Sequence, residues 1–551
     1  MLTILVATCL VAGCSQTEPL RLTLIGTNDV HGALLPGEDR GGLAALSGHV
    51  NAVRAARQDD GGAVLLIDAG DMWQGTLESN ITEGASVVAA FNALQYTAAA
   101  IGNHEFDFGP SGPLPIPGSE ADDPRGALKQ RAKEARFPFL AANLIDEATG
   151  KPVAWDNVYP SVIVDVEDVK VGIIGVMSHN ALATTIASNT VGLRVAPLAR
   201  TIEREARALR AAGATIVIVT AHAGGECTRF DEPYDLSSCE TRHEIFGVAE
   251  ALPADLVDHI FAGHVHKGLA HIVNGISITS SYSRATAFSR VDLLVDRKRG
   301  SVIDKTLFPP TSLSIAGNYE GVELTPSRDV VEIADRAAEF AAEFKEQKVG
   351  ITLETPFKLT DDPESALGNL YTHSMLDGVD ADISIHVING GIRANLPAGE
   401  LDFGSVYEMS PFDNQLMIIE LSGAELRQVI SEQAHRGSRR IGFSGMRVSV
   451  NCTDTIMSVA MHHDDGREIE DTDSVRVAVT NYLAFGGDNV LRSVIPDGGF
   501  DPQPNAPMVR DIIMRSLSKR GGSVDTSDFD SSASPRWQLP ASIDRECRLL
   551  P

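Results

Sequence analysis

The stretch AIGNHEFDFG, Ala100–Gly109, follows an apolar run that begins at Thr97 and is typical of a buried strand. The run stops at Gly102. An amide, an imidazole and two carboxylates come directly after it, at Asn103, His104, Glu105 and Asp107. We therefore ask whether other strands of the chain also end in polar side chains that could meet at one place.

Six further apolar runs of β type lie between residues 21 and 308. They are RLTLIG (21–26), AVLLIDAGD (63–71), FPFLAANL (137–144), VKVGIIGV (169–176), TIVIVTAH (215–222) and LVDHIFAGH (256–264). Amphipathic helical patterns separate several of them, for example at 42–58 and 197–212. This alternation predicts an α/β domain with largely buried strands, whose ligands gather where strand ends meet loops.

Metal-ligating side chains follow five of the predicted strands, each next to glycine or another turn residue. They are Asp29 and His31, Asp71, Asn103, His222, and His264 and His266. Oxygen and imidazole donors of these kinds suit a pair of divalent cations that share a bridging carboxylate and activate a water. The D-x-H and H-x-H spacings predict that both side chains of each pair lie on one face of an extended strand.

Any one of these motifs alone has a high false-positive risk. We expect Asp68 only to cap a turn, and Glu105 and Phe106 to have structural roles. Five groups in this order, all at strand ends, are much harder to explain as packing. The combination therefore predicts a site for two metal ions.

The segments GTNDVHG, DAGDMWQG, GNHEFDFG and GHVH resemble the calcineurin-like metallophosphoesterases, and in particular their 5′-nucleotidase branch, which includes exported bacterial enzymes. The resemblance covers nearly all of residues 21–490. It implies an α/β fold in which a β-sandwich is flanked by helices (αββα) and is followed by a second α/β domain for the substrate.

The same resemblance implies the distribution of the ligands. One ion would be held by Asp29, His31 and His266, the other by Asn103, His222 and His264, with Asp71 bridging. Some relatives have Gln or Asn in place of His266, so the preferred metal can differ, and Zn, Mn, Fe, Mg and Ca all accept parts of such a set. His104 is left to reach the phosphoryl group or its leaving oxygen, while Asp107 holds the imidazole and favours its protonated form.

The second half of the chain contains INGGIR (388–393), SPFDNQL (410–416) and NYLAFGGDNV (481–490). Arginine suits bidentate recognition of phosphate, although a Gly-Gly-x-Arg turn and a lone aromatic are weak signals by themselves. The family resemblance implies that Phe412 and Tyr482 sandwich a nucleobase and that Asp488 binds the sugar hydroxyls. It also implies that Asn389 and Arg393 hold the substrate.

Two departures from the family pattern bear on the substrate. Relatives often have additional arginines around the LGNL segment, whereas KLTDDPESALGNL (358–370) has acidic residues there. GGDN (486–489) also stands where GGDG is usual, which could reshape the sugar contact. The first change subtracts positive charge from the predicted substrate cleft.

Four segments are expected along the chain. They are a lipoprotein signal and tether (1–19), a catalytic domain (20–325), a linker helix (326–348) and a C-terminal substrate-specificity domain (349–551). The linker keeps helical spacing at Val331, Ala334, Ala338 and Phe344. An ordinary domain helix is the open alternative for this segment.

The N-terminal stretch MLTILVATCLVAGCS resembles a bacterial lipobox in which Cys14 is lipidated, although the usual Lys or Arg before the apolar run is missing. A buried strand or short helix is the alternative. Lipidation would place the protein in the periplasm or cell envelope, touching the membrane only through this anchor. Sequence alone does not fix cysteine connectivity, and we expect disulfides between Cys227 and Cys239 and between Cys452 and Cys547.

The formal net charge of −28 over 551 residues argues against nucleic acid or an anionic membrane surface as a partner. We expect an exported phosphoesterase with two divalent ions, Zn, Mn or similar, that hydrolyses 5′-nucleotides by attack of a metal-bound hydroxide. Alternatives with the same chemistry are a 2′,3′-cyclic phosphodiesterase/3′-nucleotidase, a UDP-sugar hydrolase and a thiosulfohydrolase. A non-catalytic surface binding protein is the alternative of a different class.

Overall fold

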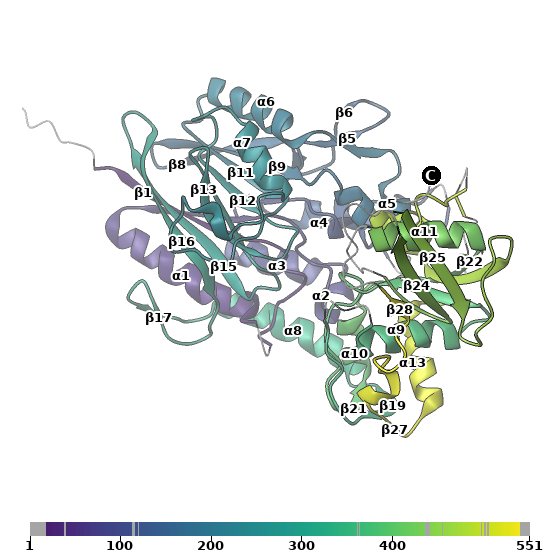
Figure 1. Cartoon of the computed structure of the whole chain (residues 1–551). Coiled ribbons are helices and arrows are strands. Elements are labelled where there is room, and N and C mark those ends of the chain that lie inside the picture. Colours follow the sequence, from purple (N-terminus) through teal and green to yellow (C-terminus); the bar gives the residue numbers. More distant parts are fainter. Residues whose placement is uncertain are drawn as a thin grey trace, which may run out of the picture.

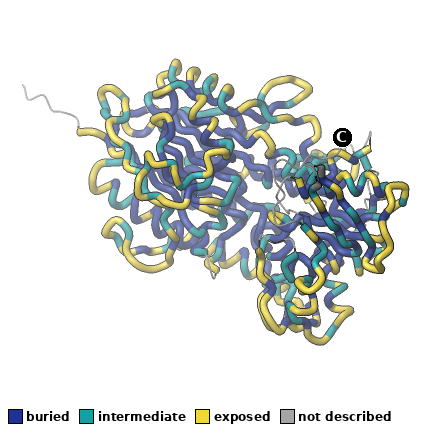
Figure 2. Tube along the Cα trace, viewed as in Figure 1, coloured by how far each residue is buried: buried dark blue, intermediate teal, exposed yellow. Residues whose placement is uncertain are grey.

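The computed structural model describes residues 18–539, apart from 38–39, 113–115, 120, 361, 363, 436–440, 454–455, 497–498, 501–502 and 504–505. The chain forms an N-terminal lobe, purple to teal in Figure 1, and a C-terminal lobe, green to yellow. Buried chain fills the interior of both lobes (Figure 2). The predicted anchor residue Cys14 and the predicted disulfide partner Cys547 lie outside the described residues.

Two sheets packed face to face form the centre of the N-terminal lobe. The first has the order β16 (Ser301–Ser312), β15 (Ala287–Asp296), β1 (Leu20–Thr27), β2 (Ala63–Asp68), β3 (Ala98–Ala100), β4 (Phe139–Leu140) and β7 (Val158–Tyr159). The second has the order β13 (Gly268–Val273), β14 (Ile276–Ser281), β12 (His259–Ala262), β11 (Ile216–His222), β9 (Val169–Met177) and β8 (Ser161–Val166). Each of the seven strand runs expected from the sequence overlaps one of these strands.

The apolar side chains of both sheets meet in a core of their own that includes Leu22, Ile67 and Ile218. The sheets approach closely beneath the site, because a Cβ on Gly26 of β1 would lie 2.2 Å from the Phe261 ring of β12. Glycine is therefore required at this position.

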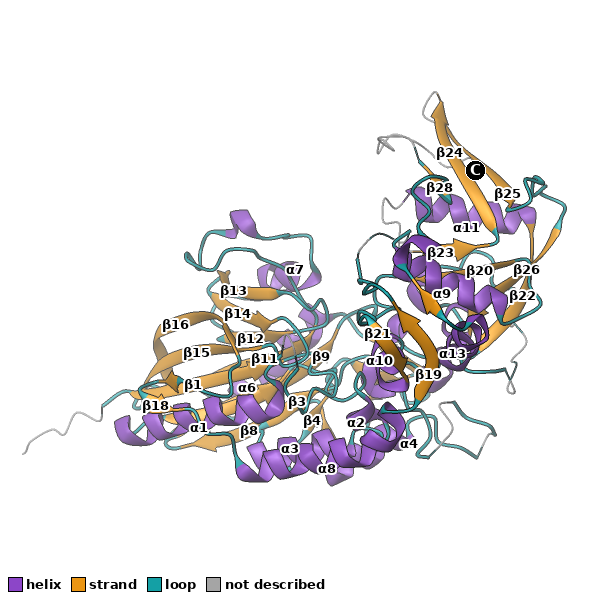
Figure 3. Cartoon of the chain, turned by 90° about the horizontal axis from the view of Figure 1, so that it is seen from below, coloured by secondary structure: helices purple, strands orange, loops and turns teal. Residues whose placement is uncertain are grey.

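Helices cover the outer face of each sheet. The helices α1 (Gly42–Asp60), α3 (Ala85–Leu94), α4 (Gly126–Glu134) and α8 (Arg328–Lys345) pack on the first sheet. Figure 3 shows α1, α3 and α8 together along one side of the lobe. The helices α6 (Leu198–Ala211) and α7 (Glu244–Ala251) pack on the second sheet. The expected αββα arrangement is confirmed.

Helix α8 occupies the predicted linker and connects the lobes by packing as well as by sequence. Val330, Ala334 and Ala337 enter the core of the N-terminal lobe. One turn further on, Ala341 packs with Leu77 of the N-terminal lobe and Tyr407 of the C-terminal lobe.

The C-terminal lobe is a second α/β unit, as expected. Its main sheet has the order β22 (Leu416–Ser422), β26 (Ser474–Thr480), β20 (Ile383–Val387) and β23 (Ile441–Ser444). Two three-stranded sheets accompany it, β21 (Gly399–Asp402), β19 (Lys348–Leu353), β27 (Ser523–Val524), and β25 (Ile456–His463), β24 (Met446–Thr453), β28 (Trp537–Gln538). The helices α9 (Ala366–Asp377), α10 (Phe403–Met409), α11 (Gly423–His435) and α13 (Val509–Arg520) surround these sheets.

Within the described part of the chain, none of the helices has the length and apolar character needed to cross a membrane.

The predicted disulfide between Cys227 and Cys239 is present and closes a loop with a sequence separation of 12. The Cys227 N–H also donates to the carbonyl of Gly268 at the start of β13, at 3.0 Å, so the loop is fixed to the second sheet. We expect the double substitution Cys227→Ser, Cys239→Ser to lower the free energy of unfolding by about 3 kcal/mol, because the open loop gains entropy in the unfolded chain. Urea denaturation followed by circular dichroism measures the change. A midpoint equal to that of the wild type, with the wild-type disulfide shown to be formed, would contradict the prediction.

Candidate active site

The predicted metal ligands all come from the carboxyl ends of neighbouring strands. In the first sheet, β1, β2 and β3 are adjacent and parallel, and the loops after them carry Asp29 and His31, Asp71, and Asn103. In the second sheet, β11 ends at His222, and the loop after its parallel neighbour β12 carries His264 and His266. Because the two sheets are packed face to face, these strand ends meet at one edge of the sandwich.

The backbone at this edge differs from the strand geometry expected from the motif spacing. Asp29, His31, Asp71, His264 and His266 all have positive φ, between 49° and 77°. These residues follow the strands in tight loops, so strand alternation does not place them and that part of the interpretation is wrong. Non-glycine residues in this conformation are uncommon, and such strain concentrates at functional sites.

The first group of ligands consists of Asp29, His31 and His266. The Nε2 atoms of the two imidazoles are 2.9 Å apart, and an Asp29 oxygen lies 3.3 Å from His266 Nε2. The three ligand atoms lie within 4.8 Å of one another. This is the predicted set for one ion.

The second group consists of Asn103, His222 and His264, together with Asp71. The Asn103 Oδ1 atom is 2.9 Å from His222 Nε2 and 3.0 Å from His264 Nδ1. The Asp71 Oδ2 atom lies 3.1 Å from His222 Nε2. H-x-H thus divides between the groups, since His264 belongs to the second and His266 to the first. Bridging by Asp71 stays a prediction.

The donor set fits divalent cations. The second ring nitrogens of His31 and His222 face the carbonyl oxygens of Gln74 and Ala69, at 2.8 and 2.9 Å. Such contacts make Nδ1 the protonated nitrogen and direct the Nε2 lone pair into the site, as is usual for metal-binding histidines. Two imidazole nitrogens 2.9 Å apart can share at most one proton, whereas a cation satisfies both.

The loop after β2 is built around Glu105. This buried carboxylate accepts hydrogen bonds from the backbone N–H groups of Gly102, Asp71 and Met72, at 2.6 to 2.9 Å. Gly102 is required because a Cβ there would lie 2.2 Å from Asp71 Oδ1. The structural role predicted for Glu105 agrees with these contacts. Burial, with the nearby Asp71, raises the pKa of Glu105 to about 7.

Asp68 likewise shows the turn role that its position suggested. Its carboxyl accepts from Gly70 N–H and Thr27 Oγ1, at 2.8 and 2.6 Å. Burial raises its pKa well above the ordinary value.

His104 and Asp107 form a close pair, with 2.6 Å between His104 Nδ1 and Asp107 Oδ2. The His104 N–H donates to Asp71 Oδ1 at 2.9 Å, which fixes the backbone of the pair to the metal-binding edge. Burial alone would lower the pKa of His104, but the charges of Asp107 and Asp71 outweigh it and raise the pKa. The protonated imidazole is therefore favoured, as a proton donor requires.

The charge of Asp71 also raises the pKa of His222. Burial opposes the charged imidazole, but Asp71 raises the pKa of His222 to about 10. Because a ligating imidazole is neutral, binding of a cation to this group must release a proton.

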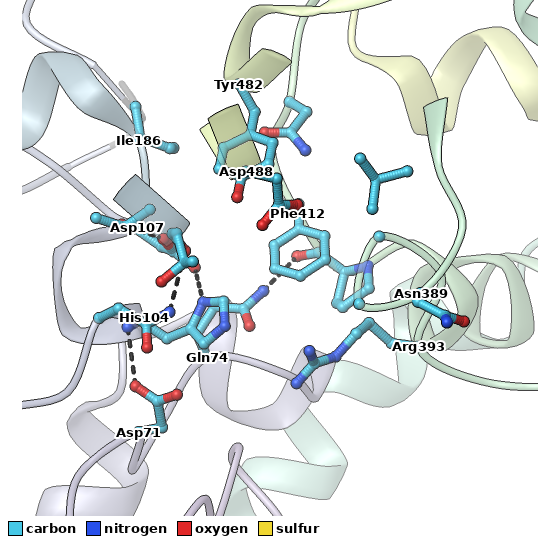
Figure 4. A pocket seen from close by; sticks show the side chains of 18 of the residues that line it. Asp71, Gln74, His104, Asp107, Ile186, Asn389, Arg393, Phe412, Tyr482 and Asp488 are labelled. Atoms are coloured by element: carbon cyan, nitrogen blue, oxygen red, sulfur yellow. Dashed lines mark hydrogen bonds and ion pairs between the residues drawn. The ribbon is translucent and has the colours of Figure 1, made fainter. Parts of the chain in front are cut away.

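A cavity of about 260 Å³ lies between the two lobes and opens onto the second ligand group. The predicted substrate residues Asn389, Arg393, Phe412, Tyr482 and Asp488 all line it, together with Asp71, Asn103, His104, Asp107, His264 and His266. Figure 4 shows Asp71, His104 and Asp107 on the wall from the N-terminal lobe, with Arg393, Asn389 and Phe412 opposite. Asp29, His31 and His222 do not line this cavity and are fully or almost fully buried.

Arg393 connects the two lobes at the metal site. Its guanidinium Nη2 lies 3.0 Å from His31 Nε2. Its backbone carbonyl accepts a 2.6 Å hydrogen bond from Arg284 of the N-terminal lobe. The phosphate-binding arginine expected from the sequence is thus held beside the first ligand group.

Comparison with known families agrees with this geometry. Residues 22–268 match the family model of the calcineurin-like phosphoesterases, and residues 348–493 match that of the 5′-nucleotidase C-terminal domain. The two matches together cover more than two thirds of the chain. The chain belongs to the 5′-nucleotidase family of calcineurin-like phosphoesterases. Members of this family are metal-dependent phosphoric ester hydrolases.

Relatives of this 5′-nucleotidase family member are distant in sequence. The cell wall protein Lmo0130 of Listeria monocytogenes is 24% identical over 88% of this chain, which spans 66% of that protein's length. The protein UshA of Escherichia coli is 22% identical, with 95% of each chain covered.

Solved structures share the fold. The 5′-nucleotidase precursor from Thermus thermophilus superposes with a TM-score of 0.72 at 21% identity, covering 95% of this chain and 100% of its own. The sulfate thiohydrolase SoxB from the same genus has a TM-score of 0.68 at 16% identity, covering 95% and 97%.

The cavity of this protein is also lined by residues that the sequence interpretation missed. Gln74, Thr184, Thr185, His386 and Asn414 all line the cavity. Gln74 stands in the quoted DAGDMWQG segment, so its place in that motif was a usable signal. Its side-chain N–H group donates to Pro411 O across the cavity at 3.2 Å. Asn414 likewise stands in the quoted SPFDNQL segment, whereas Thr184, Thr185 and His386 follow no motif that we recognised.

The structure shows where the two departures from the family pattern lie, namely the acidic segment 358–370 and the GGDN turn. Residues 358–370 contribute nothing to the described cavity wall, and Glu364 instead accepts the N–H groups of Arg536 and Trp537. Among the described residues, Arg393 is the only Arg or Lys that lines the cavity. In GGDN, Asn489 has a φ of 54°, a left-handed conformation that Asn tolerates better than most residues. The substitution therefore keeps a turn that glycine would also form.

Proposed function

We propose that this protein is a dimetal phosphoesterase that hydrolyses nucleotides, best 5′-nucleotides, to nucleoside and phosphate. The observation that carries this proposal is a single cavity lined by ligands of the second group, by the His104–Asp107 pair and by two aromatic side chains of the other lobe. The reacting phosphoryl group and an aromatic base would occupy its two ends.

Each residue then has a defined task. Two divalent ions held by the two ligand groups, with Asp71 between them, would supply positive charge and lower the pKa of an attacking water. Arg393 binds the phosphoryl oxygens from the opposite lobe. As the P–O bond to the leaving group breaks, His104 gives its proton to the departing alkoxide, and Asp107 stabilises the imidazolium form.

A panel of phosphate esters tests the substrate. AMP, 3′-AMP and p-nitrophenyl phosphate would be assayed for phosphate release, and 2′,3′-cyclic AMP and UDP-glucose for their monoester products, each with Zn²⁺, Mn²⁺, Mg²⁺ and Ca²⁺. We expect AMP to have the highest kcat/KM. A higher value for the cyclic ester, 3′-AMP or UDP-glucose would replace the proposed substrate, and no turnover of any ester with any ion would reject the reaction.

Hydrolysis of a thiosulfate ester is the second candidate. The sulfate thiohydrolase SoxB shares this fold. The single arginine in the described cavity wall supports an ester with less negative charge than a nucleotide. Sulfate release from a thiosulfonated peptide separates the two candidates.

The aromatic residues give a prediction for base recognition. Phe412 lies beside His104, with ring centroids 5.7 Å apart, and Tyr482 lines the same cavity. We expect Phe412→Ala and Tyr482→Ala each to raise KM for AMP roughly tenfold, because stacking contributes about 1–3 kcal/mol per base. The matched controls Phe412→Tyr and Tyr482→Phe keep the ring and should stay near wild type. An equal loss on ribose 5-phosphate, which has no aromatic ring to stack, would contradict this role.

We further propose export and a lipid anchor on Cys14. The apolar N-terminal run that ends in VAGC supports this, as does the name of the Listeria relative, a cell wall protein. Labelling of the expressed full chain with radioactive palmitate should be lost in Cys14→Ser. Equal labelling of both forms would reject the anchor.

A further inference from the structure

The segment 181–190 covers the loop that carries His104. It consists of the turn η2 (Ala181–Thr184), Thr185 and Ile186, and the short helix α5 (Ala187–Thr190). Thr185 and Ile186 are buried and line the cavity, and Figure 4 shows Ile186 on the same wall as Asp107. No metal ligand and no residue of the reaction proposed above lies in this segment.

Three hydrogen bonds attach the segment to the site below it. The Thr184 carbonyl accepts from the Asn103 side chain at 3.0 Å, which turns the amide oxygen towards His222 and His264. The Asn189 side chain donates to Phe106 O at 2.8 Å. Thr185 Oγ1 donates to Asp107 Oδ1 at 2.7 Å.

The hydrogen bond from Thr185 gives the second oxygen of the Asp107 carboxylate a partner. Asp107 Oδ2 faces His104 Nδ1 at 2.6 Å, and Oδ1 accepts from Thr185. The terminal torsion of an aspartate is intrinsically broad, so a carboxylate with a partner on one oxygen alone can rotate. With partners on both oxygens, the plane of the carboxylate and the direction of the imidazole are fixed.

We propose that Thr185 is a positioning residue for leaving-group protonation. By holding Oδ1 of Asp107, it keeps the His104 imidazole directed at the oxygen that departs from phosphorus. Thr185 itself touches no reacting atom and transfers no proton. The inference rests on the proposed function of His104 and Asp107 and adds a third member to that pair.

The same segment, 181–190, also contacts the C-terminal lobe. Thr185 therefore lies between the His104–Asp107 pair and the part of the cavity formed by the C-terminal lobe. The turn η2 packs against the turn η4 (Gly487–Asn489), which contains the predicted sugar-binding residue Asp488. Substrate held by Asp488 would therefore lie next to the segment that orients Asp107.

The test compares two leaving groups in the metal-loaded full chain. Departure of a nucleoside alkoxide needs a proton, whereas p-nitrophenolate leaves without one. For Thr185→Ala we expect kcat for AMP to fall about tenfold with KM unchanged, while kcat for p-nitrophenyl phosphate stays within about twofold. If another alkyl monoester proves the better substrate, it takes the place of AMP. Thr185→Ser, which keeps the hydroxyl, should restore most of the AMP activity.

Matched controls separate positioning from damage to the fold. Thr190→Ala removes a hydroxyl from the same segment. Among the described residues this hydroxyl bonds only to Ala187 O, at 3.1 Å, so the variant should behave as wild type. Metal content and thermal unfolding of Thr185→Ala should equal those of the wild type.

Two results would overturn the inference while leaving the proposed function intact. They are equal losses of Thr185→Ala on both substrates, or unchanged activity on both, with an active wild type. Failure of the proposed function gives a different result, because the wild type itself would then hydrolyse no ester.

Discussion

Replacement of Asp71 by Asn is expected to reduce kcat/KM for phosphate esters on the order of a thousandfold and to lower the bound metal. The amide keeps an oxygen that can accept the His104 N–H now donated to Asp71 Oδ1 at 2.9 Å. It lacks the negative charge that lies 3.1 Å from His222 Nε2 and would offset the repulsion between two cations. Phosphate release and metal analysis of the purified variant measure both effects.

Asp68→Asn is the matched control, three residues away at the end of β2. Burial raises the pKa of Asp68 well above its usual range, so the amide resembles the protonated carboxyl. It can still accept from Gly70 N–H and meet Thr27 Oγ1, the two partners of the native side chain. We expect activity within a few-fold of wild type. An Asp71→Asn protein with full metal content and activity within tenfold of wild type would remove Asp71 from the centre of the site.

Replacement of His104 by Ala is expected to reduce kcat for AMP about a hundredfold or more, the usual contribution of a general acid. The pKa of His104 is raised, against the effect of burial, by Asp107 and Asp71, so a proton is available near neutral pH. Because His104 binds no metal in the predicted arrangement, the variant should keep its metal. Single-turnover rates with AMP and p-nitrophenyl phosphate, together with metal analysis, test this combination.

His179→Ala is a suitable control for the loss of an imidazole. His179 is exposed and pairs with Glu244 at 2.8 Å, away from the cavity. Its removal should leave both substrates unaffected. A His104→Ala protein that has lost its metal, or that slows both esters equally, would show that His104 supports the site rather than protonating the leaving group.

The sequence was sufficient to predict that the candidate metal ligands meet at one edge, because the topology of the sheets decides where strand ends lie. Strands such as β1, β2 and β11 are marked by continuous apolar runs, and parallel strands present their carboxyl ends at one edge. The residues directly after those runs therefore meet, whatever the local backbone. The details of the local backbone could not be predicted in this way, and Asp29 and His31 adopt left-handed conformations where an extended strand was expected.

Packing between segments was much harder to predict. In α8 the apolar spacing pointed to Val331, Ala334, Ala338 and Phe344. The structure buries Ala334 as expected, together with Val330, Ala337 and Ala341, but leaves Val331 and Ala338 half-buried and Phe344 40% exposed. Small residues face the neighbouring helices because they allow close approach, and hydrophobicity alone does not reveal that preference. The position of Thr185 in the site could not be predicted for a related reason. Its hydroxyl matters only because Asp107 lies beside it in the fold.

The candidate metal ligands and the predicted base- and sugar-binding residues lie in different lobes, and this separation bears on how substrate specificity can change during evolution. All seven predicted ligands belong to the first lobe, whereas Phe412, Tyr482 and Asp488 belong to the second. We therefore expect substitutions at these three positions to alter which molecule is accepted, while the candidate metal ligands and Arg393 stay in place. The same catalytic site could in this way be combined with second lobes that select different substrates.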